Sequence, residues 1–257
     1  MLLYKAWLES RIRFFVGLFA VVAVCILFIR LHPILIPGWV IAMGQPKEPK
    51  PWWLSLGIRE YGFYLWHFLF ENKLQQILVL FAVLFGLGGL SREWATGVAL
   101  YSLGLPISRR RWLFSRILVA LMESGILALS AVLAIAAASV SIHQAFSLRE
   151  VFLHCALMFA GAIVFTAVGI LMSILFRGEQ LVQLSIIALL LLPYIVLQEF
   201  NRGPHPGWQN FVNIAGVLSG PWDLTWTNIP WVGLVVTWLL AGALFWISAF
   251  QGDHVDF

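Results

Sequence analysis

Long apolar runs separated by short polar segments dominate the hydrophobic pattern of the chain. A helix of about 20 apolar residues crosses a hydrocarbon core of roughly 30 Å, so runs of this kind are typical of transmembrane helices. We therefore expect an all-α membrane protein with six spans in a single transmembrane domain, residues 1–257. The predicted spans cover about 14–29, 74–90, 117–140, 151–176, 181–197 and 231–250.

The composition also indicates that the protein lies in a membrane. The chain is 61% hydrophobic and 11% charged, whereas a soluble domain carries about a quarter of its residues as Asp, Glu, Lys or Arg. The net charge of +4 is small, and the basic residues lie at the ends of apolar runs rather than in a tract that follows a nucleic-acid backbone. We expect membrane lipid around the protein and no nucleic-acid partner.

The distribution of basic residues predicts the orientation. Six spans place both termini on one side, and more Lys and Arg residues fall in the short segments on that side than in the much longer opposite loops. The positive-inside rule then predicts that the termini and the loop 91–115 are cytoplasmic, in a bacterial inner membrane. The basic N-terminus followed by the run 14–29 has the outline of a signal peptide without a small-x-small cleavage site, so we expect a retained first span.

Residues 2–13 precede the first predicted span. Lys5, Glu9 and Arg13 lie on one helical row, and apolar residues lie on another. This pattern predicts an N-terminal amphipathic interfacial helix on the inner leaflet. The alternative is a basic flank that only orients the first span.

Two longer segments, 31–72 and 198–228, are predicted to lie on the outer face. The first begins with several prolines, which favour irregular backbone, and then becomes aromatic between Tyr61 and Phe70. Tyr and Trp are typical of headgroup depth, so we expect a helix lying in the interface. The second segment mixes Gly, Pro and Trp in the same way, and both are expected to be membrane-hugging caps.

The loop between the second and third spans has the most specific pattern. Ser91 can cap a short helix with Glu93 in its first turn, Pro106 ends that helix, and Ser108 can cap the next one. Residues 109–111 are three arginines in the first turn of that next helix, where positive charge opposes the helix dipole. Phosphate headgroups or an acidic partner surface would favour them there.

This loop resembles that of the type 2 ABC exporter permeases. In that family a Glu-x-x-x-Gly-Thr helix, followed by a Leu-x-x-Pro-x-Ser-Arg turn, joins the second and third spans. Val98 departs from the pattern, because it stands where the family has Thr. The matching residues are Glu93, Gly97, Leu103, Pro106, Ser108 and Arg109.

The resemblance implies a cytoplasmic coupling helix that docks onto a separate ABC ATPase subunit. Two permeases, as a homodimer or a pseudo-symmetric dimer, would work with two ATPases, and ATP and Mg²⁺ would bind to the ATPases rather than to this chain. The chain has no Gly-Lys pair and so no phosphate-binding P-loop. Gly97 would allow close approach, Pro106 would fix the turn, and Glu93 and Arg109 would offer charges for pairing across the subunits.

Glu123 is the candidate intramembrane polar site, because an ionised carboxylate two turns inside the third span is costly. It lines a substrate or proton path, or it pairs with Arg116 or with a hydroxyl of a neighbouring span. His154 is expected to be a hydrogen-bonded core residue, and His67 with Glu71 an i,i+4 pair. The histidines show no metal-ligand spacing, so no metal site is predicted.

Small residues inside the spans have two interpretations. Gly86, Gly88 and Gly89 in the second span, and Gly161 and Gly169 in the fourth, permit close helix packing or are ordinary membrane-helix glycines. The two cysteines, at positions 25 and 155, are expected to be packing residues.

We expect the permease subunit of an ATP-binding cassette exporter that moves an amphiphilic or lipid-like compound, drug or peptide. The alternative is a non-transporting membrane scaffold or assembly subunit. An intramembrane enzyme is disfavoured because the H-E-x-x-H, G-x-S-x-G and S-x-x-K signatures are absent.

Overall fold

The computed structural model describes residues 2–42, 60–87, 109–175 and 214–254. Every regular element in these ranges is a helix. The expectation of an all-α protein is therefore confirmed for the described part of the chain.

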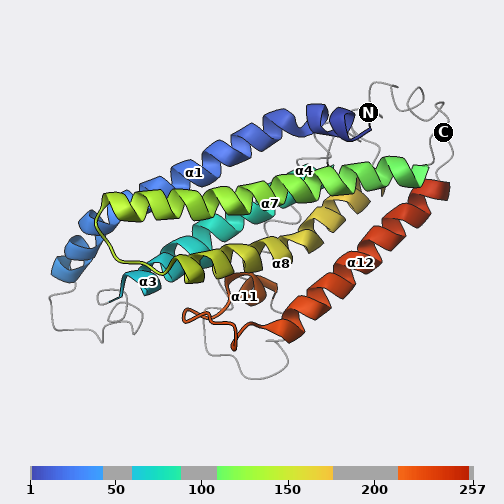
Figure 1. The fold of residues 1–257 in the computed structure, drawn as a ribbon. Helices are drawn as coiled ribbons and strands as arrows, with labels where there is room; N and C mark the ends of the chain where they lie inside the picture. The colour runs from blue at the N-terminus through green and yellow to red at the C-terminus, as the bar shows by residue number, and fades with distance from the viewer. Residues whose placement is uncertain (1, 43–59, 88–108, 176–213, 255–257) are drawn as a thin grey trace.

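Five of the described helices are long and apolar enough to cross a membrane (Figure 1). The first is α1 (Leu2–Ala42). The second is a continuous rod formed by α3 (Tyr61–Tyr64), the π-helix η1 (Leu65–Leu74) and α4 (Gln75–Leu87). The others are α7 (Arg109–Ser141), α8 (Leu148–Leu175) and α12 (Trp231–His254), and a short helix, α11 (Ile214–Ser219), precedes α12. Together these helices indicate a membrane-embedded protein.

The helices run in two opposite directions through one bundle. α1 and α7 begin at one end, which we call the N-terminal end, and α4, α8 and α12 end there (Figure 1). Arg13 of α1 donates to the Leu84 carbonyl of α4 at this end, at 3.1 Å. At the opposite end, the hydroxyls of Tyr61 and Ser139 are 2.8 Å apart.

Five of the six predicted spans coincide with these helices. The predicted span 181–197 lies outside the described residues. The described residues on either side of it are at opposite ends of the bundle, because Ile174 packs beside Leu113 at the N-terminal end and Ser219 bonds to His154 near the start of α8.

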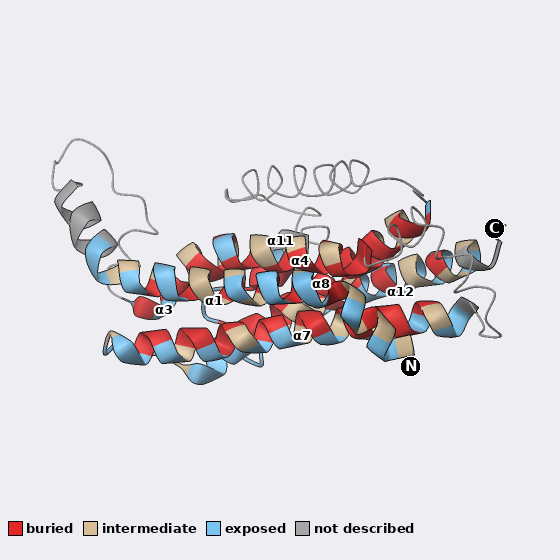
Figure 2. Ribbon diagram, turned by 90° about the horizontal axis from the view of Figure 1, so that it is seen from above, coloured by how far each residue is buried: buried red, intermediate tan, exposed pale blue. Residues whose placement is uncertain are grey.

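The centre of the bundle is the contact between α4 and α8. A Cβ atom at Gly86 would come within 2.3 Å of the Thr166 carbonyl oxygen, and one at Gly169 within 2.6 Å of the Val83 carbonyl oxygen. The prediction of close packing is thus confirmed for Gly86 and Gly169, whereas Gly88 and Gly89 lie outside the described residues. Small residues let the two backbones approach, which gives dispersion contacts that lipid cannot replace. Figure 2 shows buried positions along the helices that meet here.

The predicted N-terminal interfacial helix is wrong as a separate element. α1 is one continuous helix from Leu2, so residues 2–13 extend the first transmembrane helix. They do so because a buried row begins inside them and continues through the span. This row consists of Ala6, Ser10, Phe14, Val21, Cys25 and Ile29.

The predicted irregular backbone after residue 31 is also wrong up to Ala42, because α1 continues through Pro33 and Pro37. Each proline removes one backbone hydrogen bond. Unwinding the helix in an apolar environment would leave several backbone groups without partners, so the helix is the less costly choice.

The aromatic segment that starts at Tyr61 lies inside the bundle and not on its surface. Phe63, Tyr64 and Phe70 are almost completely buried. The Tyr64 hydroxyl donates to the Phe28 carbonyl of α1 at 2.7 Å. Because the polar atom has a partner, the ring is buried at little cost, and an interfacial position is not required.

Candidate functional site

Glu123 lies in the contact between α1 and α7. Its side chain is buried, with 1% of its surface exposed, and it faces α1. The Ser10 hydroxyl donates to its Oε1 atom, and the charge of Arg13 acts on the same carboxyl group. Oε2 is buried and forms no hydrogen bond with the described residues. Of the structural interpretations of Glu123, the bond to a hydroxyl of a neighbouring helix is the correct one.

Arg116 pairs with α1 and not with Glu123. Its Nη2 atom is 2.8 Å from Oε2 of Glu9, and the contact is an ion pair without the alignment of a hydrogen bond. The guanidinium also lies over the Trp112 ring, 4.7 Å from its centroid. Because side chains on a helix point back towards its N-terminus, Arg116 reaches towards the end of the bundle where Glu9 lies. The predicted pairing with Glu123 is therefore wrong.

Together these residues form what we call the polar cluster: Glu9, Ser10, Arg13, Arg116 and Glu123. It joins three helices, since Arg13 reaches α4 while the other contacts link α1 to α7. Lys5 adds an outer contact at 4.0 Å from Glu9. Buried charges in an apolar medium interact strongly and tolerate little displacement, so the cluster fixes how α1, α4 and α7 sit against one another.

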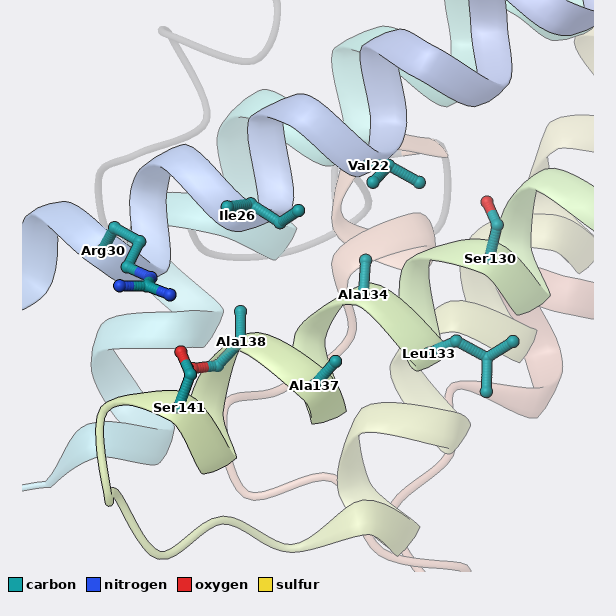
Figure 3. Close-up of a pocket in the computed structure, with 9 residues that line it drawn as sticks. All are labelled: Val22, Ile26, Arg30, Ser130, Leu133, Ala134, Ala137, Ala138 and Ser141. Carbon is teal, nitrogen blue, oxygen red and sulfur yellow. The ribbon is translucent and has the colours of Figure 1, made fainter.

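The same pair of helices forms a groove nearer the opposite end (Figure 3). Its volume is about 480 Å³, which is within the range of small-molecule sites. The small side chains of alanines on α7, including Ala134 and Ala138, leave the groove open. Val22 and Ile26 of α1 line its other side. Among the lining residues Arg30 alone is charged, and Figure 3 shows it directed towards the Ser141 end of α7. The groove is thus apolar along its length and cationic at one end.

A second set of polar contacts lies near the opposite end, around η1. The His67 and Glu71 side chains are 2.9 Å apart, as the predicted i,i+4 pair requires. The Nδ1 atom of His154 donates to the Ser219 carbonyl oxygen of α11 at 2.8 Å. His154 is buried and stacks on Phe70, so the prediction of a hydrogen-bonded core residue is confirmed. No feature of the sequence indicated the π-helical winding of this segment, which is a geometry often found at functional sites.

We expect His154→Leu to lower the free energy of unfolding by about 1–3 kcal/mol, because the buried Ser219 carbonyl loses its donor. Thermal unfolding of the protein in detergent measures the change. The exposed His143 has a positive φ of 55°, so His143→Asn is a suitable histidine control and should leave the midpoint unchanged. Equal midpoints for His154→Leu and the wild type would contradict this role.

The residues of the predicted coupling loop are not part of the site as described. Glu93, Gly97, Pro106 and Ser108 lie outside the described residues. Arg109 is the first described residue of α7, and the predicted cap at Ser108 stays a prediction. The described residues that flank the loop, Leu87 and Arg109, both lie at the N-terminal end, the same end as the polar cluster.

Comparison with known proteins identifies one family. The model of a family described as a protein of unknown function (DUF2705) matches residues 39–220, which is more than half of the chain. No curated protein and no solved structure matches the chain significantly. The matched region includes the rod from Tyr61 to Leu87, α7, α8 and α11. The chain therefore belongs to the DUF2705 family.

Proposed function

We propose that the chain is the transmembrane permease subunit of an ATP-binding cassette exporter. One observation carries the proposal: residues 88–108 connect the described parts of α4 and α7, and both helices are held in the bundle core by buried contacts. Together with Arg109 of α7, these residues carry the Glu93 to Arg109 motif. Force applied to it would reach α8 through the contact at Gly86 and α1 through the polar cluster.

The charge distribution supports a cytoplasmic location for this loop. Among the described residues, Lys5, Arg11 and Arg13 of α1 and the basic residues at the start of α7 gather at the N-terminal end, whereas few cations lie at the other. By the positive-inside rule this end faces the cytoplasm of a bacterial cell. A sixth span at 181–197 completes the topology, because the chain then passes from the end of α8 to α11 at the opposite end.

The proposed cargo is an amphiphilic or lipid-like compound, drug or peptide. The groove between α1 and α7 supports this class, since its walls are apolar and Arg30 supplies a charge at one end. Exposed apolar residues on α1 and α12 leave surface for lipid and for a second permease. ATP and Mg²⁺ bind to the partner ATPase, which supplies the energy for transport.

The test is to express the chain with the ATPase encoded beside it, purify the complex and reconstitute it in vesicles. We expect Glu93→Gln combined with Arg109→Gln to lower transport at least about tenfold while ATP hydrolysis continues, because cross-subunit couplings are typically of this size. Transport and hydrolysis are measured on the same preparation. Arg149→Gln with Glu150→Gln removes the same two charge types at the exposed start of α8 and should have no effect.

Normal transport in the Glu93/Arg109 variant would reject the docking role of the loop. If no ATPase co-purifies with the wild-type chain, the exporter assignment itself is rejected. The alternative of a membrane scaffold or assembly subunit would then account for the bundle.

A further inference from the structure

A second groove lies between the first turns of α7 and the last turns of α12, at the N-terminal end. Its volume is about 490 Å³. Leu113 and Ala249 form its floor, where they pack with residues of α8. The small side chain of Ala249 leaves the space open between the two helices.

The walls of this groove are large apolar side chains that face away from the bundle. Phe114 is 64% exposed, Trp246 is 76% exposed and Phe250 is 56% exposed. All three lie on helices long and apolar enough to cross a membrane. A Trp at the end of a span is typical of the interface between headgroups and acyl chains, and the two Phe residues add apolar surface beside it.

One edge of the groove is cationic. Arg110 and Arg111 line it, and both are exposed. They occupy the first described turn of α7, where the helix dipole adds to the positive potential. An anion at this edge would receive charge-assisted hydrogen bonds from the two guanidinium groups.

The groove has a cationic edge and an apolar channel, which match the anionic headgroup and the acyl chain of a lipid. Arg110 and Ile117 both line it and are seven residues apart on α7, so the groove extends roughly 10 Å along the helix from its charged edge. A soluble acidic protein would complement the charge of the arginines but would leave the walls at Phe114 and Trp246 uncovered. An anionic lipid complements the charge and also covers the walls.

We propose that this groove binds an anionic phospholipid, with its phosphate at Arg110 and Arg111 and an acyl chain between Phe114, Trp246 and Phe250. The lipid comes from the leaflet at the N-terminal end of the bundle. The proposal is independent of the exporter function, because it concerns only the surface formed by α7 and α12.

The experiment uses the full chain purified in a neutral detergent, with phosphatidylglycerol or phosphatidylcholine added and bound lipid measured by native mass spectrometry. We expect the wild type to retain phosphatidylglycerol in preference to phosphatidylcholine. Arg110→Gln with Arg111→Gln should weaken phosphatidylglycerol binding about tenfold or more, since each basic residue near an anionic lipid contributes substantially. Trp246→Ala keeps both charges and should weaken binding by removing one wall.

Arg11→Gln with Arg149→Gln is the matched control, because it removes two exposed arginines that do not line the groove. It should retain phosphatidylglycerol as the wild type does. An equal loss in this control would show attraction by overall charge and would overturn the site. The lipid proposal would also be overturned if the Arg110/Arg111 variant bound phosphatidylglycerol unchanged but lost a co-purified protein. The groove would then be a protein contact.

Thermal unfolding provides a second measurement that does not depend on lipid surviving in the spectrometer. Added phosphatidylglycerol should raise the melting midpoint of the wild type more than that of the Arg110/Arg111 variant, because a ligand stabilises only the form that binds it. An equal rise in both proteins would overturn the proposal.

Discussion

Gly169→Ala should lower the free energy of unfolding by about 3 kcal/mol, at the upper end of the range for overpacked cores. The added methyl group would lie 2.6 Å from the Val83 carbonyl oxygen and 3.1 Å from the Gly86 Cα atom. Both contacts are with backbone, which cannot rotate away as a side chain can. The variant can accommodate the methyl group only if α4 and α8 separate, and separation loses packing along the whole contact.

The measurement is unfolding in mixed micelles at increasing denaturing detergent, followed by tryptophan fluorescence. Gly86→Ala should also lower the free energy of unfolding, because its Cβ atom would lie 2.3 Å from the Thr166 carbonyl oxygen. Gly242→Ala in α12 is the matched control, since its Cβ would meet no atom within 4 Å. This control should gain about 0.5–1 kcal/mol from the better helix propensity of alanine. Equal stability for Gly169→Ala and the control would contradict the close packing.

Arg116→Met should lower the free energy of unfolding by about 3 kcal/mol, because Glu9 loses the guanidinium that lies 2.8 Å away. Breaking a partly buried ion pair by removing one partner leaves the other charge desolvated without compensation. Glu9 keeps about a fifth of its side chain exposed and retains Lys5 at 4.0 Å, so the loss should be near the lower end for buried pairs.

The double variant distinguishes the ion pair from the packing of the arginine stem. Glu9→Gln with Arg116→Met removes both charges and should recover most of the lost stability, because no uncompensated charge remains. Lys5→Ala, which disrupts a more exposed pair on the same helix, should cost less than about 0.5 kcal/mol. If the double variant is as unstable as the sum of the single changes, the two residues do not interact energetically.

The polar cluster also couples the movements of α1, α4 and α7. It joins α1, α4 and α7 at the end where the loop 88–108 is attached. In the proposed exporter, a shift of α4 or α7 must therefore move α1 with it or break contacts that have no water to replace them. A cluster of this kind favours discrete packing arrangements over gradual deformation.

The sequence by itself determined the helical class and the positions of five spans. These features are local, because summed hydropathy over a span does not depend on what lies across the bundle. The close contact at Gly86 and Gly169 was one of two interpretations of the glycines, and the structure selected it. Residues 88–108, which carry the resemblance to exporter permeases, lie outside the described residues, so the function stays a proposal.

The tertiary structure alone decided the rest of the site. It placed Glu9 beside Arg116 and Ser10 beside Glu123. It also placed the aromatic segment that starts at Tyr61 in the interior of the bundle. It also formed the two grooves of α7, one with α1 and one with α12. Partner choice between charged residues on different helices depends on helix direction and axial register, which the pattern along one helix does not contain. Burial of a tyrosine likewise depends on whether a carbonyl of another helix lies within reach of its hydroxyl.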